Sequence, residues 1–261
     1  MIFIDQINNV LQLENTPKRI VSLVPSQTEL LVDLGLEEDI IGITKFCIHP
    51  SKLRKEKVIV GGTKNIDFNK IKALKPDIIL CNKEENTKDI VENCKLIAPT
   101  HVSDIYTIDD TFELMNLYGE IFKCKSESKK IIESLIEKVT DFKQFIKDKQ
   151  SRRAAYFIWK NPWMVAGNNT FINHLLKLNN FVNVYSNKER YPEVDILKLK
   201  KLDAILLSSE PFPFKENHIK ELEVNFPKTK ILLVDGEMFS WYGSRLLKSF
   251  DYFKKLQKLL A

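Results

Sequence analysis

Short apolar runs rich in β-branched residues alternate with stretches of helical pattern along most of this chain. In the first half, apolar runs cover residues 19–24, 40–44 and 77–81, and helical patterns cover residues 25–36 and 67–75. Runs of this length are typical of buried strands, and strands that alternate with helices usually form parallel sheets. The alternation therefore predicts an α/β fold with mostly parallel sheets.

The second half of the chain repeats this order. An apolar run at 152–159 predicts a strand and residues 169–178 predict a helix. Residues 193–202 have a helical pattern, and the apolar run at 203–209 follows them. The repetition predicts two similar α/β lobes.

The start of the first helical stretch carries local signals. Ser26 is followed three residues later by Glu29, which is the spacing of a capping box, so we expect Ser26 to be the N-cap. Gly35 is expected to close this short helix.

Residues 109–150 contain no proline and only one glycine. Helical spacing places Ser128 at the head of one apolar stripe, which continues with Ile131, Ile132, Leu135, Ile136, Val139, Phe142 and Ile146. A helix of ~24 residues would be ~36 Å long, long enough to link two lobes. We therefore expect an N-terminal lobe at 1–108, linking helices at 109–150 and a C-terminal lobe at 151–261.

The composition excludes several classes of protein. The net charge of +5 is spread along the chain, with lysines offset by glutamates, so we expect no nucleic-acid partner. No stretch approaches the ~18 apolar residues of a membrane span, so we expect no membrane insertion. Asp5 stands where a secretory signal would be basic. The expected location is cytoplasmic if Met1 is the natural start and periplasmic if a leader has been removed.

The four cysteines are widely spaced and form no CxxC motif. This spacing favours reduced thiols over disulfides. Cys47 and His49 alone do not supply the three or four ligands that a metal site needs. We therefore expect neither a metal site nor a resident cofactor.

Loops that follow strands in a parallel sheet line the ligand crevice. In this chain those loops are unusually rich in aromatic and charged side chains, and all three tryptophans lie in them. A bulky ligand needs large apolar faces with a few polar anchors. The residues that we expect to bind such a ligand between the lobes are Lys45, Phe46, Thr63, Lys64, Asn65, Glu84, Glu85, Trp159, Trp163, Arg190, Tyr191, Glu210, Phe212, Glu237, Phe239, Trp241, Tyr242 and Arg245.

The last of these loops, within residues 234–246, combines aromatic residues with charges. We expect Trp241 and Tyr242 to offer ring faces to the ligand. Arg245 would act as a polar anchor, because helical side chains lean toward the N-terminus of their helix. The alternative is a local aromatic cluster that closes the end of the lobe.

Catalysis is the less favoured alternative. Glu84 and Glu210 could act as paired carboxylates, as in glycosidases. The sequence contains no nucleophile elbow, and residues 61–65 (GGTKN) form a tight turn without the later residues of a phosphate loop. We therefore assign no catalytic residue.

Residues 19–36 (RIVSLVPSQTELLVDLGL) and 61–80 (GGTKNIDFNKIKALKPDIIL), together with the long central helix and the aromatic last loop, resemble the helical-backbone substrate-binding proteins. These class III periplasmic binding proteins serve ABC importers of vitamin B12, ferric siderophores and haem. The resemblance covers nearly the whole chain. It implies a two-lobed fold, a bulky small-molecule ligand and an ABC permease as partner.

Two departures from this family bear on the ligand and the partner. Thr63 stands where cobalamin binders have a tryptophan that packs on the corrin, whereas Tyr191 keeps an aromatic ring at a second such place. The family docks its importer through one exposed glutamate on each lobe. Asn69 and Leu197 stand at those places, with Asp67 and Glu193 nearby, so the docking glutamates are absent from them.

The function expected from these observations is reversible binding of a corrinoid, ferric siderophore or haem for ABC-type uptake. A corrinoid is preferred on the opening motif, residues 24–30. A cytosolic ligand carrier or sensor without a permease is the alternative, and an enzyme that uses Glu84 and Glu210 is the third hypothesis.

Overall fold

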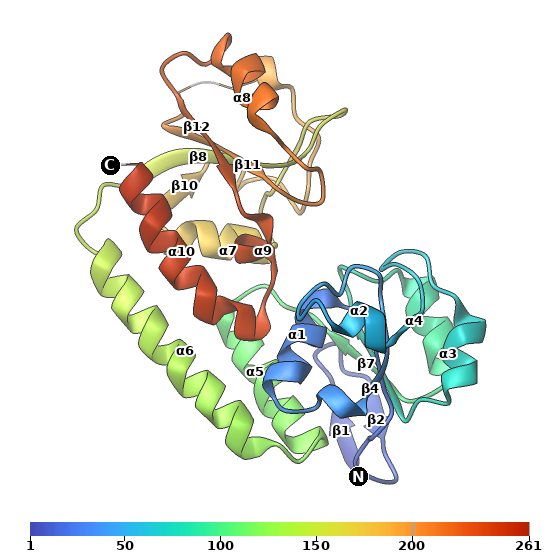
Figure 1. The fold of residues 1–261 in the computed structure, drawn as a ribbon. Coiled ribbons are helices and arrows are strands. Elements are labelled where there is room, and N and C mark those ends of the chain that lie inside the picture. Colours follow the sequence, from blue (N-terminus) through green and yellow to red (C-terminus); the bar gives the residue numbers. More distant parts are fainter. Residues whose placement is uncertain (200, 261) are drawn as a thin grey trace. The chain divides into compact units, whose positions relative to one another are not determined.

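The structure, a computed structural model, describes residues 1–199 and 201–260. The chain forms two compact units (Figure 1). Unit 1 contains Met1–Leu135 and Tyr242–Arg245, and unit 2 contains Ile136–Trp241 and the residues from Leu246 onward. This division differs from the expected boundaries: residues 109–135 and 242–245 belong to unit 1.

Unit 1 is built on a five-stranded sheet in which all neighbouring strands are parallel. The strand order is β5-β4-β3-β6-β7. The three apolar runs of the first half form its central strands, which confirms that part of the prediction. The strands are β3 (Ile20–Ser22), β4 (Ile40–Ile43), β5 (Val58–Ile59), β6 (Ile78–Asn82) and β7 (Thr100–Ser103). A separate antiparallel hairpin joins β1 (Ile2–Ile4) to β2 (Val10–Gln12).

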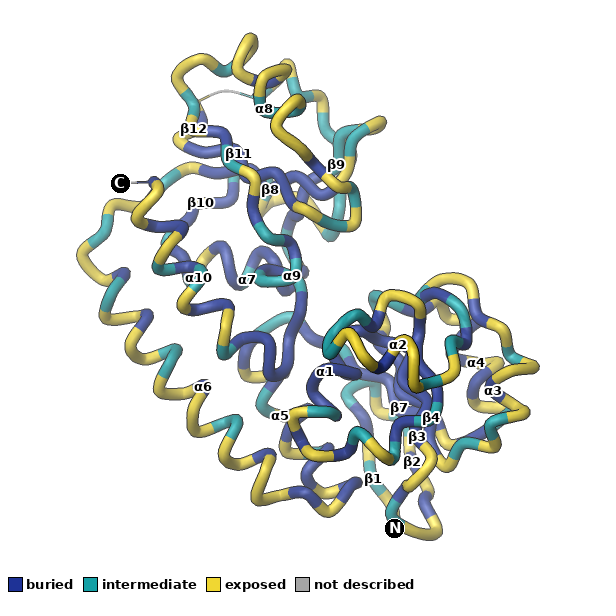
Figure 2. Tube along the Cα trace, in the orientation of Figure 1, coloured by how far each residue is buried: buried dark blue, intermediate teal, exposed yellow. Residues whose placement is uncertain are grey.

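Helices cover the sheet of unit 1 on both faces (Figure 1). Ile71 and Ile90, from two of these helices, pack in one buried cluster with Val21 of β3 and Ile79 of β6. The strands β3, β6 and β7 are buried along their whole length, and Figure 2 shows this central part of the unit in dark blue. The helices are α1 (Pro25–Asp33), α2 (Leu53–Glu56), α3 (Phe68–Leu74), α4 (Lys88–Lys95) and α5 (Ile108–Ile121), with a 3₁₀ turn η1 (Glu37–Asp39).

Helix α1 begins two residues earlier than its capping-box pattern predicts. Its N-cap is Val24, and no side chain caps it. Pro25 at the first helical position explains the shift, because proline lacks the amide hydrogen that a cap would satisfy and has a helical φ. Ser26 therefore lies inside the first turn. The helix ends as expected, since Gly35 has a φ of 81° and its amide bonds to the carbonyl of Val32.

Unit 2 contains a second parallel sheet, with strand order β10-β8-β11-β12 and a short antiparallel strand β9 beside β8. The strands are β8 (Arg152–Trp159), β9 (Met164–Val165), β10 (Phe181–Asn183), β11 (Ala204–Ser208) and β12 (Lys230–Val234). The helices are α7 (Phe171–Leu178), α8 (Glu216–Glu223), α9 (Gly236–Ser240) and α10 (Leu246–Leu259). The α/β fold predicted from sequence is thus confirmed in both units.

The prediction of a helix at 193–202 is wrong. The structure has only a 3₁₀ turn, η2 (Ile196–Lys198), and residue 200 lies outside the described residues. The side chain of Asp195 bonds to the amide of Leu197, which satisfies the backbone locally. Lys201 has a φ of 53°, a left-handed conformation that ends any helical run. The helical pattern of residues 193–202 reflects packing of Ile196 and Leu199 on the core rather than a regular helix.

The long helix predicted in the middle of the chain is present as α6 (Lys125–Ile146), 22 residues in length. The boundary between the two units falls within it. Leu135, Phe142 and Ile146 of the predicted stripe are buried, whereas Ile136 is 48 % exposed. In the described part of the chain, no helix has both the length and the apolar character that crossing a bilayer requires.

Candidate ligand-binding site

A tight turn after β4 presents two of the residues that the sequence singled out. The carbonyl of Thr44 accepts a hydrogen bond from the amide of Cys47 at 3.1 Å. Both of these residues are buried, and the Cys47 Sγ lies 3.1 Å from Thr28 Oγ1. Burial raises the pKa of the Cys47 thiol, so the thiol stays protonated near neutral pH. The anchored ends leave Lys45 and Phe46 exposed at the tip of the turn.

A second turn, at residues 61–66, lies beside the first. The amide of Gly62 bonds to the carbonyl of Asn65 at 2.7 Å, which places Thr63 and Lys64 at the tip. Gly61 has a φ of 128°, and a Cβ there would lie 2.3 Å from the Asn65 carbonyl oxygen, so only glycine fits. The amide of Lys45 bonds to the carbonyl of Gly61 at 2.8 Å and fixes one turn to the other. The sequence prediction of a tight turn here is confirmed.

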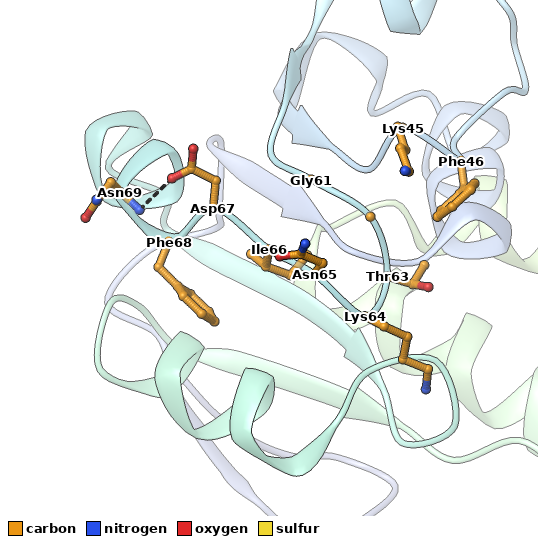
Figure 3. Close-up of a pocket in the computed structure, with 11 residues that line it drawn as sticks. Lys45, Phe46, Gly61, Thr63, Lys64, Asn65, Ile66, Asp67, Phe68 and Asn69 are labelled. Atoms are coloured by element: carbon orange, nitrogen blue, oxygen red, sulfur yellow. Dashed lines mark hydrogen bonds between the residues drawn. The ribbon is translucent and has the colours of Figure 1, made fainter.

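The two turns and the start of α3 surround a surface pocket of about 900 Å³ (Figure 3). Five of the residues expected to bind a ligand line it, namely Lys45, Phe46, Thr63, Lys64 and Asn65. The sequence did not single out the other lining residues as ligand contacts: Gly61, Gly62, Ile66, Asp67, Phe68 and Asn69. The paired glycines were the signal that could have pointed to them, because they mark a backbone that another group approaches closely.

The loop after β6 supports the second turn. Lys64 Nζ donates to the carbonyl of Glu84 at 2.6 Å, and Asn86 Nδ2 donates to the carbonyl of Thr63 at 3.0 Å. Asn82 accepts from the amides of Glu84 and Glu85 through its side-chain oxygen. Seven predicted residues therefore come from three neighbouring loops at the carboxyl edge of one sheet, where α/β proteins bind ligands.

Glu210 lies in a polar cluster in unit 2, at the carboxyl ends of β11 and β12. Its Oε1 accepts hydrogen bonds from Ser240 Oγ at 2.8 Å and from Trp241 Nε1 at 3.0 Å. Burial, and to a lesser degree the charge of Glu237, raises the pKa of the Glu210 carboxyl. The bonds from Ser240 and Trp241 oppose that rise. The Glu210 carboxylate is thus already hydrogen-bonded to two side chains of the protein.

The aromatic residues of unit 2 mostly pack on one another. Trp163 stacks on Phe214 with ring centroids 5.9 Å apart and lies edge-on to Phe157 at 5.4 Å. Phe212 packs between Phe214, at 4.7 Å, and Trp159, at 5.7 Å. Of this cluster Trp159 is the most accessible, with 39 % of its surface exposed. The cluster closes the end of the sheet and leaves Trp159 as its exposed face.

Phe239 is a correction to the predicted site. It is fully buried and packs against Tyr156 and Phe253, with ring centroids 5.1 and 4.8 Å away. It lies in the short helix α9, whose apolar side faces the core. No surface of Phe239 is left for a ligand.

The last loop also differs from its prediction. Trp241 is only 8 % exposed and Tyr242 only 6 %, so neither offers a free ring face. The Tyr242 hydroxyl accepts from Gln27 Nε2 at 2.9 Å. Arg245 Nε donates to Glu29 Oε2 at 2.7 Å. The loop is therefore mainly structural, which is the alternative left open by the sequence.

Arg190 and Tyr191 form a small, partly buried pair in unit 2. The guanidinium carbon lies 6.0 Å from the centre of the Tyr191 ring. Arg190 has a φ of 58°, and its amide and carbonyl bond to Asn168 and Gly167, so the backbone fixes where the pair stands. Whether this pair and Glu237 contact a ligand stays a prediction.

A buried polar network in unit 1 escaped the sequence analysis. Tyr118 OH donates to Gln27 Oε1 at 2.7 Å, and Gln27 Nε2 donates to Ser103 Oγ at 2.7 Å. His101 lies against Tyr118 in an edge-to-face contact and is fully buried. Burial lowers the pKa of His101 to about 4, although the charge of Asp5 opposes this. Gln27 is 91 residues from Tyr118 and 76 residues from Ser103, so no local pattern revealed these bonds.

The described residues contain no group of three or more histidine, cysteine, aspartate or glutamate side chains able to hold a metal ion. The four cysteines are buried and free of disulfides.

Residues 20–211 match the family described as periplasmic binding protein. The chain belongs to this family. The match spans more than half of the chain and includes both sheets in large part.

One relative of this chain is an uncharacterized ABC transporter substrate-binding lipoprotein of Bacillus subtilis. The two are 25 % identical over 95 % of this chain and 82 % of the relative. The family and its relatives are binding proteins.

Solved structures share the fold. The periplasmic vitamin B12-binding protein of Vibrio cholerae superposes with a TM-score of 0.81 at 18 % identity, covering 94 % of this chain and 98 % of the other. The periplasmic heme-binding protein of Roseiflexus sp. RS-1, in its apo form, gives a TM-score of 0.81 at 13 % identity, covering 94 % and 99 %. At these identities the comparison establishes the fold and leaves the ligand open.

Proposed function

We propose that this periplasmic binding protein is the substrate-binding component of an ABC importer for a bulky ligand of the vitamin B12, haem or ferric-siderophore class. The observation that carries the proposal is the match to a substrate-binding lipoprotein over 95 % of the chain. The pocket of unit 1, lined by five residues that the sequence had singled out, supports it. A pocket of about 900 Å³ is at the large end of small-molecule sites.

We propose that the ligand is cargo and that the protein has no resident cofactor. A corrinoid, haem or ferric chelate brings its own metal ligands, so the protein needs only shape and a few polar groups to hold it. Lys45, Lys64 and Phe46 are groups of this kind in the pocket. The predicted residues of unit 2, with Trp159 the most accessible of its aromatic cluster, are proposed to contribute to the same function.

We propose that the partner is an ABC permease and that the protein works outside the cytoplasmic membrane, as the names of its relatives indicate for them. The residues at the family's docking places are Asn69, which is exposed, and Leu197, which is 72 % exposed. Docking would then use contacts other than paired glutamates.

Cell fractionation tests the location: recovery only in the cytosol would favour a carrier or sensor without a permease.

The test of ligand binding is a thermal-shift and absorbance titration of the full chain. The ligands are cyanocobalamin, haemin, a ferric hydroxamate and a ferric catecholate. Saturable stabilisation by one of them is the expected result, because a ligand that binds only the native state raises the unfolding temperature. If none of the four binds, the proposed function is wrong for this class of ligand.

A further inference from the structure

The pocket of unit 1 has a positive character that its own residues do not neutralise. Its cationic side chains are Lys45 and Lys64, and its one acidic side chain is Asp67. Among the described residues, no carboxylate lies within 4.0 Å of either lysine ammonium group. Lys64 Nζ instead contacts a backbone carbonyl, and Lys45 Nζ lies over an aromatic ring.

The acidic side chain of the pocket is already engaged. Asp67 is the N-cap of α3, and its Oδ1 accepts from the amides of Asn69 and Lys70 at 3.1 Å each. Its other oxygen lies 4.0 Å from Lys70 Nζ. Glu84 and Glu85 are in the neighbouring loop, but neither lines the pocket. Among the side chains that line the pocket, the two lysines are therefore the charged groups left to meet a ligand.

Both lysines are held at the pocket by contacts with the protein. Lys64 is fixed by its bond to the Glu84 carbonyl at 2.6 Å. Lys45 Nζ lies 5.0 Å from the centre of the Phe46 ring. Gly62 packs beneath both side chains, since a Cβ there would lie 3.1 Å from the Phe46 ring and 3.4 Å from Lys45 Cε. Figure 3 shows Lys45 and Phe46 on one turn and Thr63 and Lys64 on the other.

We infer that the pocket binds the anionic oxygen groups of the ligand, with Lys45 and Lys64 as the cationic contacts and the half-exposed Phe46 ring against the apolar body. This inference rests on the proposed function and narrows its ligand class. Lysine ammonium groups are compact point charges that bind carboxylate and other anionic oxygens. The ligand would carry carboxylates, as the propionates of haem do, or anionic catecholate or carboxylate groups, as many ferric siderophores do. Cyanocobalamin, which has no net charge, fits this pocket less well, so the preference for a corrinoid is reversed.

The experiment compares four ligands on the full chain and on four variants. The ligands are haemin, a ferric tris-catecholate, the cationic hydroxamate ferrioxamine B and cyanocobalamin. The variants are Lys45→Gln, Lys64→Gln, the double variant and Lys72→Gln. Lys72 is an exposed lysine of α3 that does not line the pocket. The Lys72→Gln variant therefore makes the same change in net charge outside the pocket.

The expected result is that haemin or the ferric tris-catecholate binds the unchanged protein. Each pocket variant should then raise the Kd about 10-fold, which corresponds to about 1.4 kcal/mol, and the double variant should raise it further. The Lys72→Gln protein should bind as the unchanged one does. The Kd should also rise with ionic strength, because salt screens exposed charges. Which of the two anionic ligands binds decides between a haem and a siderophore.

Two results would overturn the inference and leave the proposed function standing. One is saturable binding of cyanocobalamin or ferrioxamine B with no binding of the anionic ligands. The other is binding of an anionic ligand that the double variant leaves unchanged. Circular dichroism of each variant checks that its fold is intact. No binding of any of the four ligands would overturn the proposed function and this inference together.

Discussion

Arg245 Nε donates a 2.7 Å hydrogen bond to Glu29 Oε2, and the two side chains are only 5 % and 6 % exposed. The residues are 216 positions apart in sequence, yet both belong to unit 1. Two charges removed from water must compensate each other, because an unpaired buried charge is costly. This pair therefore anchors the segment Tyr242–Arg245 to helix α1.

Removing one member of this pair should destabilise the protein. We expect Glu29→Gln and Arg245→Met each to lower the free energy of unfolding by about 3–5 kcal/mol, because each leaves a buried group without its charged partner. The double replacement Glu29→Leu with Arg245→Met should recover much of that loss. Urea unfolding measures all three. The exposed pair of Lys129 and Glu133 supplies the control, since its loss should change little. Single-variant losses as small as those of the control would contradict the anchor.

Trp241 gives a second prediction. Trp241→Ala should lower the free energy of unfolding of the ligand-free protein by about 3–5 kcal/mol, as expected for a buried tryptophan. Trp241→Phe should cost less, because it keeps much of the buried ring and loses mainly the bond to Glu210. Thermal and urea unfolding without ligand measure both. If Trp241→Ala unfolds like the unchanged protein and only weakens ligand binding, then Trp241 is a ligand contact after all.

The sequence predicted the sheets and five of the residues that line the pocket, because both depend on local or repeated patterns. Short β-branched runs such as those containing Ile20 and Ile79, placed between helical stretches, favour buried strands. The loops after parallel strands meet at one edge of a sheet. From that rule alone, Lys45 and Lys64 were expected in one site although they come from different loops, and both line the pocket.

The rest depended on contacts that no local pattern encodes. Aromatic and charged residues in one loop indicated a ligand, yet Arg245 bonds to a glutamate 216 residues away. Phe239 was expected at the surface, but it packs against Phe253 in the core. No helix forms at 193–202 because apolar spacing records burial, whereas the extended backbone at Asp195 and Leu199 limits the helical turn to Ile196–Lys198.

The two adjacent glycines of the pocket should respond differently to the same substitution. A Cβ on Gly61 would meet the Asn65 backbone at 2.3 Å, whereas one on Gly62 would meet the side chains of Phe46 and Lys45. Gly61→Ala should therefore cost about 1–3 kcal/mol of stability. Gly62→Ala should cost less stability and weaken ligand binding, because it displaces the side chains that line the pocket. Urea unfolding and ligand titration separate the two effects, and equal losses of stability would show that the pocket side chains are as rigid as the backbone.

His101 should make the stability of the protein depend on pH. Burial lowers its pKa to about 4 from 6.5, so the unfolded chain binds more protons than the folded one between these values. The free energy of unfolding contributed by this group is complete above pH 6.5 and falls as the pH drops toward 4, by about 3 kcal/mol in total. The Tyr118 hydroxyl, 3.5 Å from Nδ1, and the nearby charge of Asp5 are the groups that act on the ring.

The measurement is urea unfolding between pH 7.5 and 4.5 of the unchanged protein and of His101→Gln. The other three histidines are common to both proteins, so the difference between the two pH profiles isolates His101. The unchanged protein should lose more stability on acidification than the variant does, with most of the difference appearing below pH 6.5. Parallel profiles would mean that the folded protein protonates His101 as readily as the unfolded chain does, and the ring would then have to be accessible to solvent.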